Sequence, residues 1–112
     1  SGHRIIVLDK GRGPGGRMAA RRVELAGTQV SFDHGAQYFT ARDPAFRDQV
    51  GAWEAAGVAA RWPAAGEDAW VGTPGMNAPI RAMAAGLDVR WGLRAERLQH
   101  DGARWHVDVG EQ

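Results

Sequence analysis

The sequence predicts an α/β fold, which in the isolated piece would count as α+β. Residues 4–9 (RIIVLD) form a continuous apolar run that ends in an acid, as in strands of parallel sheets. Two later stretches, residues 43–57 and 78–85, carry helix signals. An Asp-Gly pair near the end of the chain marks a β-hairpin. The chain is therefore expected to contain both strands and helices.

The first strand, at residues 5–8, needs neighbours, because an uninterrupted apolar strand is typical of the interior of a parallel sheet. It begins almost at residue 1, before any crossover helix that would bring a parallel partner beside it. We therefore expect an unpaired strand edge, through which copies of the chain would associate. The preceding SGH, which starts at Ser1, fits either a cloning remnant or the turn that feeds the strand.

The segment DKGRGPGGRMAARR, residues 9–22, is predicted to be a loop with one helical turn around residues 17–21. It contains four glycines, a proline and four arginines. An acid at the end of a buried strand, followed by glycines, is the arrangement that nucleotide-binding α/β units use. The same pattern also fits a structural surface loop, so the residues alone leave both interpretations open.

The nucleotide-binding interpretation gives this loop specific roles. Asp9 would accept hydrogen bonds from ribose hydroxyls, while Gly15 and Gly16 would let backbone N–H groups approach a pyrophosphate. Arg17 would pair with phosphate oxygens, and Arg12 is a second candidate on the same loop. These residues form the candidate cofactor site.

Residues 29–40 (QVSFDHGAQYFT) contain two β-prone pieces, 30–32 and 37–40, interrupted at Gly35. Tyr38 in the second piece is expected in the core, since an aromatic residue on a strand usually packs inside.

The clearest helix is residues 43–57 (DPAFRDQVGAWEAAG). Asp43 suits the N-cap, Pro44 suits the first turn and Gly57 ends the helix. The apolar residues that recur at helical spacing, and are expected in the core, are Phe46, Val50 and Trp53.

A polar connector at residues 63–69 is followed by a short strand and turn (WVGTPGMN). A second helix is predicted over residues 78–85, with Asn77 as its cap, Pro79 in its first turn and Gly86 at its end.

The stretch LRAERLQHDGARWHVDV is predicted to be a hairpin with Asp101 and Gly102 as a tight turn. In that register Leu98 lies opposite Trp105, and Arg97 lies opposite His106. The tryptophans are scattered along the chain, so most are expected to pack in a core or against another domain.

Composition favours one compact domain and excludes several kinds of protein. The chain has 112 residues, 44% of them hydrophobic, which is enough for one packed core. The net charge of +1 gives no reason to expect a nucleic acid or an anionic membrane as partner. The absence of cysteine excludes disulfides and thiolate chemistry, and the histidines lack metal-ligand spacing. No apolar stretch approaches the ~20 residues of a membrane span, so a cytoplasmic location is expected.

Three segments in a fixed order carry a resemblance to a known family: LDKGRGPGGRMAARR, FDHGAQYFTARDPAF and WVGTPGMNAPIRAMAAGLDVR. Together they resemble the bacterial renalase-like group of the flavin-containing amine oxidase superfamily, over about residues 2–109. The resemblance implies a single, partial Rossmann-like FAD/NAD(P)-binding domain over residues 1–112, with about residues 40–85 as an inserted part of the substrate domain. It implies FAD as cofactor, and an amine or a reduced nicotinamide as the small-molecule substrate of the complete enzyme.

The resemblance also implies roles for individual residues. Asp9 would hold the adenosine ribose of FAD, and Gly15, Gly16 and Arg17 would lie along the pyrophosphate and ribityl chain. The residues implied beside the isoalloxazine ring are Gly35, Ala36 and Gln37. No residue of the chain suits a general acid or base, so no catalytic residue is predicted.

The chain departs from the family pattern in two respects. Many relatives carry an arginine two residues after the acid, where this chain has Gly11, which leaves Arg12 as the substitute. The family also starts with a strand, a G-x-G-x-x-G turn and a helix, and these 112 residues contain no such unit. We therefore expect part of a larger FAD-dependent oxidoreductase, inactive by itself and unable to hold FAD alone.

Two alternatives stay open. Within the same superfamily, the parent enzyme would oxidise NAD(P)H rather than an amine. From a different class, the chain would be a stand-alone, non-catalytic binding or self-association module, or an inactive remnant.

Overall fold

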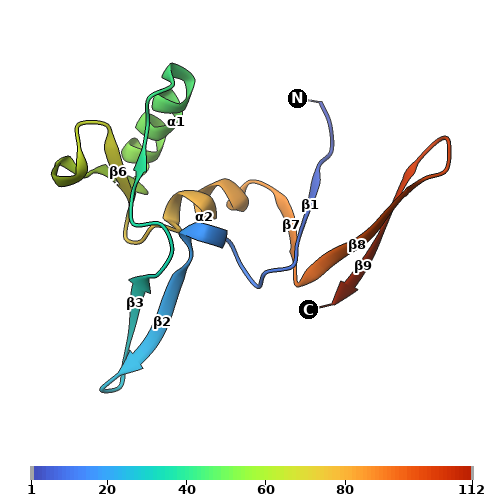
Figure 1. Ribbon diagram of the computed structural model, residues 1–112, viewed down its shortest axis with the longest axis horizontal. Helices are drawn as coiled ribbons and strands as arrows, with labels where there is room; N and C mark the ends of the chain where they lie inside the picture. Colours follow the sequence, from blue (N-terminus) through green and yellow to red (C-terminus); the bar gives the residue numbers. More distant parts are fainter. Residues whose placement is uncertain (1, 112) are drawn as a thin grey trace. The chain divides into compact units, whose positions relative to one another are not determined.

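The computed structural model describes residues 2–111, so Ser1 of the SGH start lies outside the described residues. The described residues form a mixed α/β structure with two helices, as predicted (Figure 1). Their strands form several small sheets. The described chain divides into two compact units. One joins the residues up to Gly13 with those from Ala84 onwards, and the other is Pro14–Met83. The predicted substrate-domain insertion at residues 40–85 stays a prediction.

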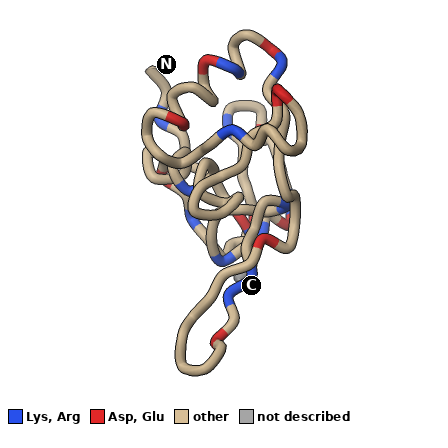
Figure 2. The backbone as a smooth tube through the Cα atoms, turned by 90° about the vertical axis from the view of Figure 1, so that its left-hand side faces the viewer, with Lys and Arg blue, Asp and Glu red and all other residues tan. Residues whose placement is uncertain are grey.

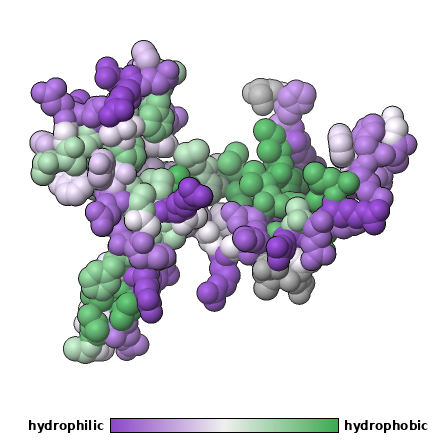
Figure 3. Space-filling view, in the orientation of Figure 1, coloured by the Kyte–Doolittle hydropathy of each residue, from purple (hydrophilic) through white to green (hydrophobic). Residues whose placement is uncertain are grey.

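In the first unit, β1 (Ile6–Asp9) runs parallel to β7 (Asp88–Trp91), which confirms the predicted parallel strand. The expectation that this strand has no partner is wrong on one edge, which β7 occupies; no strand among residues 2–111 lies along the other edge. The expected burial on both faces is also wrong, since Ile6 is 44% exposed. Two strands cannot cover both of their own faces, and Figure 3 shows apolar surface over β1 and β7.

The same unit contains the predicted hairpin, formed by β8 (Leu93–His100) and β9 (Trp105–Glu111). The predicted register is wrong by two residues. Leu98 lies opposite Val107 instead of Trp105, and Arg97 lies opposite Asp108 instead of His106.

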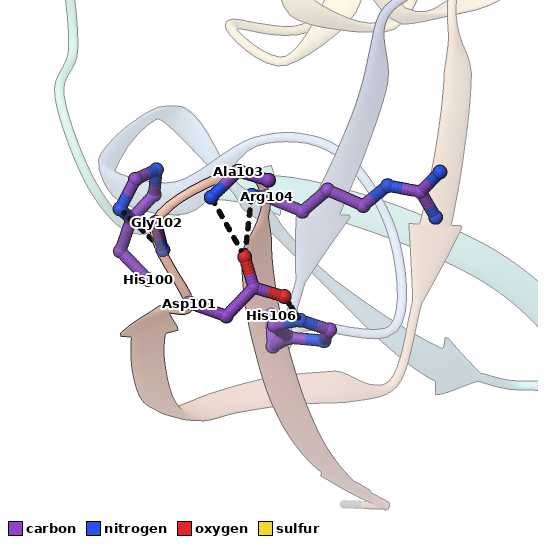
Figure 4. Close-up of polar contacts among 6 residues, drawn as sticks. All are labelled: His100, Asp101, Gly102, Ala103, Arg104 and His106. Atoms are coloured by element: carbon purple, nitrogen blue, oxygen red, sulfur yellow. Dashed lines mark hydrogen bonds and ion pairs between the residues drawn. The ribbon is translucent and has the colours of Figure 1, made fainter.

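The register differs because the side chain of Asp101 closes a longer turn than an Asp-Gly pair alone would (Figure 4). Its Oδ1 accepts hydrogen bonds from the backbone N–H groups of Ala103 (2.9 Å) and Arg104 (2.7 Å). The N–H of Asp101 in turn donates to the carbonyl oxygen of Arg104 at 3.1 Å. The turn therefore spans residues 101–104, and the second strand starts at Trp105.

The second unit begins with a 3-10 turn, η1 (Gly16–Met18), and a hairpin of β2 (Ala20–Leu25) and β3 (Thr28–Asp33). The helical turn predicted around residues 17–21 is therefore partly wrong, because the strand already begins at Ala20. Ala26 (φ 51°) and Gly27 (φ 80°) both have positive φ, as a two-residue hairpin turn requires.

The rest of this unit is a three-stranded antiparallel sheet with two helices and a further 3-10 turn. The sheet has the order β4 (Phe39–Thr40), β6 (Ala69–Gly72), β5 (Ala59–Arg61). The helical elements are α1 (Pro44–Ala55), η2 (Pro63–Ala65) and α2 (Ala78–Ala85). Both predicted helices are thus confirmed, and the strand and turn predicted in WVGTPGMN correspond to β6 and the residues after it.

The core of this unit lies between α1 and the sheet. Val50 is fully buried and packs with Ala41, Ala59 and Trp70, while Phe39 and Trp53 pack against this cluster. Phe46 is 37% exposed, so only part of the predicted apolar stripe is core. The expectation for Tyr38 is wrong: it is 45% exposed and its ring meets that of Trp62 edge-on, at 5.7 Å between centroids.

Charged residues of both signs are interspersed along the backbone (Figure 2). Arg42 and Asp68 form an ion pair at 2.6 Å between Nε and Oδ2, and the hydrogen bond from Arg42 lowers the pKa of Asp68. The longer of the two helices, α1, has 12 residues, and no helix in the described part of the chain is long and apolar enough to cross a bilayer.

Candidate dinucleotide-binding site

Asp9 lies at the carboxyl end of β1, where α/β proteins bind their ligands. Its Oδ1 accepts a hydrogen bond from the N–H of Gly11 at 2.7 Å, and the carbonyl oxygen of Gly11 accepts one from Gly92 at 2.8 Å. The side chain is exposed, and Oδ2 accepts no hydrogen bond from residues 2–111. One carboxylate oxygen thus orders the loop, and the other is free to accept hydroxyl hydrogens.

Gly11 stands where many members of the resembled family carry an arginine. A Cβ atom there would lie 3.1 Å from Asp9 Oδ1, which is closer than most Cβ contacts allow. A larger residue would crowd the turn that Asp9 caps. Arg12 follows in an exposed position, and nothing in the described part of the chain tests its assigned role.

Gly15 and Gly16 both have a positive φ, a backbone conformation that favours glycine. Gly15 has a φ of 141°, and a Cβ on it would lie 2.9 Å from the Cα of Ala19. Gly16 has a φ of 52°, and its carbonyl oxygen accepts from Ala19 to close the η1 turn. Both glycines therefore have a structural reason to be present, whatever the loop binds.

The N–H groups of Gly15, Gly16 and Arg17 meet no acceptor among residues 2–111. Successive N–H groups left free in a glycine loop form a concavity suited to an anion. The backbone therefore meets the requirement of a phosphate-binding loop, and the guanidinium of Arg17 adds a positive charge.

The structure brings the second predicted segment to this loop. The N–H of Ala36 donates to the carbonyl oxygen of Arg17 at 2.7 Å. Gly35 passes so close that a Cβ on it would overlap the carbonyl group of Arg17. Two segments that the resemblance assigned to one cofactor, residues 15–17 and 35–37, are thus in contact, and Gln37 is exposed beside them.

A contact that the sequence did not reveal joins a third segment to this place. Oδ1 of Asp33 accepts a hydrogen bond from the N–H of Met76 at 3.0 Å. The two residues are 43 positions apart, and nothing local in the sequence pairs them. The PGMN stretch of the third resembling segment was the one signal that pointed to this turn.

No cluster of histidine and acidic residues suited to a metal ion occurs within the described residues. Within the unit Pro14–Met83, the candidate groups are the backbone amides of the glycine loop and the guanidinium of Arg17, which suit a phosphate. In the other unit, the carboxylate of Asp9 suits a hydroxyl-bearing ligand.

One comparison with known proteins bears on this site. Residues 1–53 match the NAD(P)-binding Rossmann-like domain family. The matched part includes Asp9, the glycine loop and the segment at residues 35–37. The predicted Rossmann-like, NAD(P)-binding character of this part is confirmed, and it is consistent with an oxidoreductase. The assignments of single residues stay predictions.

Proposed function

We propose that this chain is part of an FAD-dependent oxidoreductase of the amine oxidase superfamily, similar to its renalase-like group. The match of residues 1–53 to a dinucleotide-binding domain carries the proposal. The resemblance of the three segments selects FAD in place of NAD(P) as the resident cofactor.

The residues fit such a cofactor within each unit. The exposed Oδ2 of Asp9 suits ribose hydroxyls, while the free N–H groups of Gly15, Gly16 and Arg17 suit a pyrophosphate. The residues assigned to the isoalloxazine end are Gly35, Ala36 and Gln37. Their backbone is held by the hydrogen bond from Ala36 to Arg17, which fixes the loop on that side.

When bound, FAD supplies the two-electron redox chemistry, and the protein supplies position and electrostatics. The task of this chain is to bind and orient: Asp9 would fix the ribose, and the glycine loop with Arg17 would neutralise phosphate charge. No side chain of the chain is assigned proton transfer. The proposed substrate is an amine or a reduced nicotinamide. The parent enzyme would accordingly act either as an amine oxidase or, as the alternative, as an NAD(P)H oxidase.

The first experiment reads the coding DNA upstream of Ser1 for a strand, a G-x-G-x-x-G turn and a helix. Finding that unit in frame supports the proposal, and an in-frame stop codon without it counts against a flavoenzyme parent. The 112-residue chain should be purified colourless. A flavin spectrum that corresponds to one FAD per chain would show that the 112 residues bind FAD without the rest of the enzyme.

The second experiment measures bound flavin in the longer protein after Asp9→Ala. Loss of a charged acceptor should weaken FAD retention about tenfold or more. The matched control is Asp88→Ala, because Asp88 is an exposed aspartate at the opposite end of the same two-stranded sheet. Equal flavin content in the Asp9 variant and the parent would contradict the ribose assignment.

A second candidate function, self-association, is favoured by the β1 edge that no described strand covers. Ile5 and Ile6 are 56% and 44% exposed beside it. An apolar strand with an open edge is a template for pairing with another copy. Sedimentation velocity should then show a concentration-dependent dimer that Ile6→Lys abolishes. Leu98→Lys, the same change at an exposed leucine of β8, should leave the dimer intact.

A further inference from the structure

A hollow of about 240 Å³ lies in the second unit, beside the polar face of the β2–β3 hairpin. Five polar side chains from three segments of the chain line it, and we call it the arginine pocket. They are Arg22 of β2, Ser31 and Asp33 of β3, Asn77, and Arg81 of α2.

The hairpin register places three of these side chains on one face. Arg22 lies directly opposite Ser31, and Asp33 follows Ser31 by two residues. Side chains alternate between the faces of a strand, so all three point to the same side. The other face carries Arg21 opposite Phe32 and Val23 opposite Val30.

The turn before α2 forms one side of the pocket, and Asp33 holds this turn in place. Oδ1 of Asp33 accepts from the N–H of Met76, and a Cβ on Gly75 would lie 3.3 Å from that same oxygen. The N–H of Arg81 donates to the carbonyl oxygen of Asn77 at 2.9 Å, one helical turn apart. Asn77 and Arg81 therefore share a side of α2, and both side chains face the hairpin's polar residues.

The charges of the pocket are two guanidiniums and one carboxylate. Neither Arg22 nor Arg81 forms an ion pair or a side-chain hydrogen bond with any residue in the described part of the chain. Oδ1 of Asp33 accepts the hydrogen bond from the N–H of Met76, and Oδ2 accepts none from residues 2–111. The pocket thus offers unused donors for an anion and one unused acceptor for a hydroxyl.

We propose that the arginine pocket binds a small phosphate monoester that carries a hydroxyl group. Arg22 and Arg81 would hold the phosphate, with Ser31 and Asn77 as neutral donors. Asp33 would accept the hydroxyl. The volume is below the roughly 300–1,000 Å³ of pockets for drug-sized ligands, so the pocket suits a ligand smaller than a dinucleotide. None of the residues that line it is one assigned to FAD.

The test titrates the full chain with glycerol 3-phosphate and, separately, with inorganic phosphate, and follows backbone amide shifts by NMR. Saturable shifts should gather at residues 31–33 and 75–77. Arg22→Gln and Arg81→Gln should each weaken binding about tenfold. Arg21→Gln is the matched control, because it removes the same charge from the opposite face of β2 and should bind like the parent.

Asp33→Asn distinguishes binding of the ligand's phosphate from binding of its hydroxyl group. The amide oxygen of the asparagine can still accept the hydrogen bond from the N–H of Met76, so the turn is kept. Without the carboxylate, inorganic phosphate should bind more tightly, and the preference for glycerol 3-phosphate should fall. Absence of saturable binding, or equal losses in the Arg21 and Arg22 variants, would overturn the proposal. If Arg22→Gln changes the circular dichroism spectrum, the phosphate affinity of Arg81→Gln decides, because Arg81 is an exposed residue of α2. Asp9→Ala should leave phosphate binding unchanged, so failure here and failure of the FAD proposal are distinguishable.

Discussion

The carbonyl oxygen of Arg17 accepts a hydrogen bond from the N–H of Ala36 at 2.7 Å, and Gly35 passes directly against the same carbonyl group. This contact ties the glycine loop to the segment after β3. Two predicted cofactor segments thus touch within a single unit, Pro14–Met83. Whatever the loop binds, its shape depends on this junction.

Gly35→Ala should therefore destabilise the protein. The added methyl group would overlap the Arg17 carbonyl, and forcing a methyl into such a contact costs about 1–3 kcal/mol. Urea unfolding followed by tryptophan fluorescence measures it, because Trp53 and Trp70 belong to the core of the same unit.

The control for this prediction is Gly51→Ala in the middle of α1, where an added Cβ meets no atom within 4 Å. That change should stabilise the protein by about 0.5–1 kcal/mol, because alanine has the higher helix propensity. If Gly35→Ala and the parent have the same free energy of unfolding, the backbone at residues 15–17 moves to accommodate the methyl group at little cost, which would contradict this prediction.

The helices were predictable from sequence because their signals are local. In α1 an aspartate, a proline and a terminal glycine lie within one stretch, and the structure places the helix at Pro44–Ala55 between them. The parallel strand β1 was also evident from its apolar run, but its partner β7 lies some 80 residues away and could not be read from that run.

Contacts that depend on tertiary structure were not predictable. The basic stretch at the start of β2 has no alternating pattern, and its strand forms only because the Ala26-Gly27 turn folds β3 against it. The hairpin register at Asp101 depended on a side chain that captures two amides. In the candidate site, the loop and its glycines were foreseen, whereas the bond from Met76 to Asp33 was not.

A second prediction concerns the start of α1. Oδ2 of Asp43 accepts a hydrogen bond from the N–H of Phe46 at 3.1 Å, so Asp43 caps the helix. Asp43→Ala should lower the free energy of unfolding by about 1 kcal/mol. Asp48→Ala removes the same charge from the middle of α1, where no cap is lost, and should cost less than Asp43→Ala. Equal losses in urea unfolding would assign the effect to charge and not to the cap.

The hairpin formed by β8 and β9 should lose stability at low pH because of Asp101. Its Oδ2 lies 2.8 Å from Nε2 of His106, and this hydrogen bond, with those from Arg104 and Ala103, lowers the pKa of Asp101 from 3.8 to about 2 (Figure 4). A lowered folded-state pKa means that the folded hairpin favours the carboxylate. The stabilisation is therefore complete above pH 3.8 and is lost as the pH falls through about 2.

A carbon-detected NMR titration of the Asp101 carboxyl group should accordingly give a midpoint near pH 2, accompanied by shifts of the Ala103 and Arg104 amides. Asp101→Asn keeps an oxygen for those amides but removes the charge, so the amide shifts should lose this pH dependence. Asp108→Asn is the control, because Asp108 lies in β9 and forms no ion pair with any residue in the described part of the chain. A midpoint at the ordinary aspartate value would show that the carboxylate does not hold the turn, and the observed register would then need another cause.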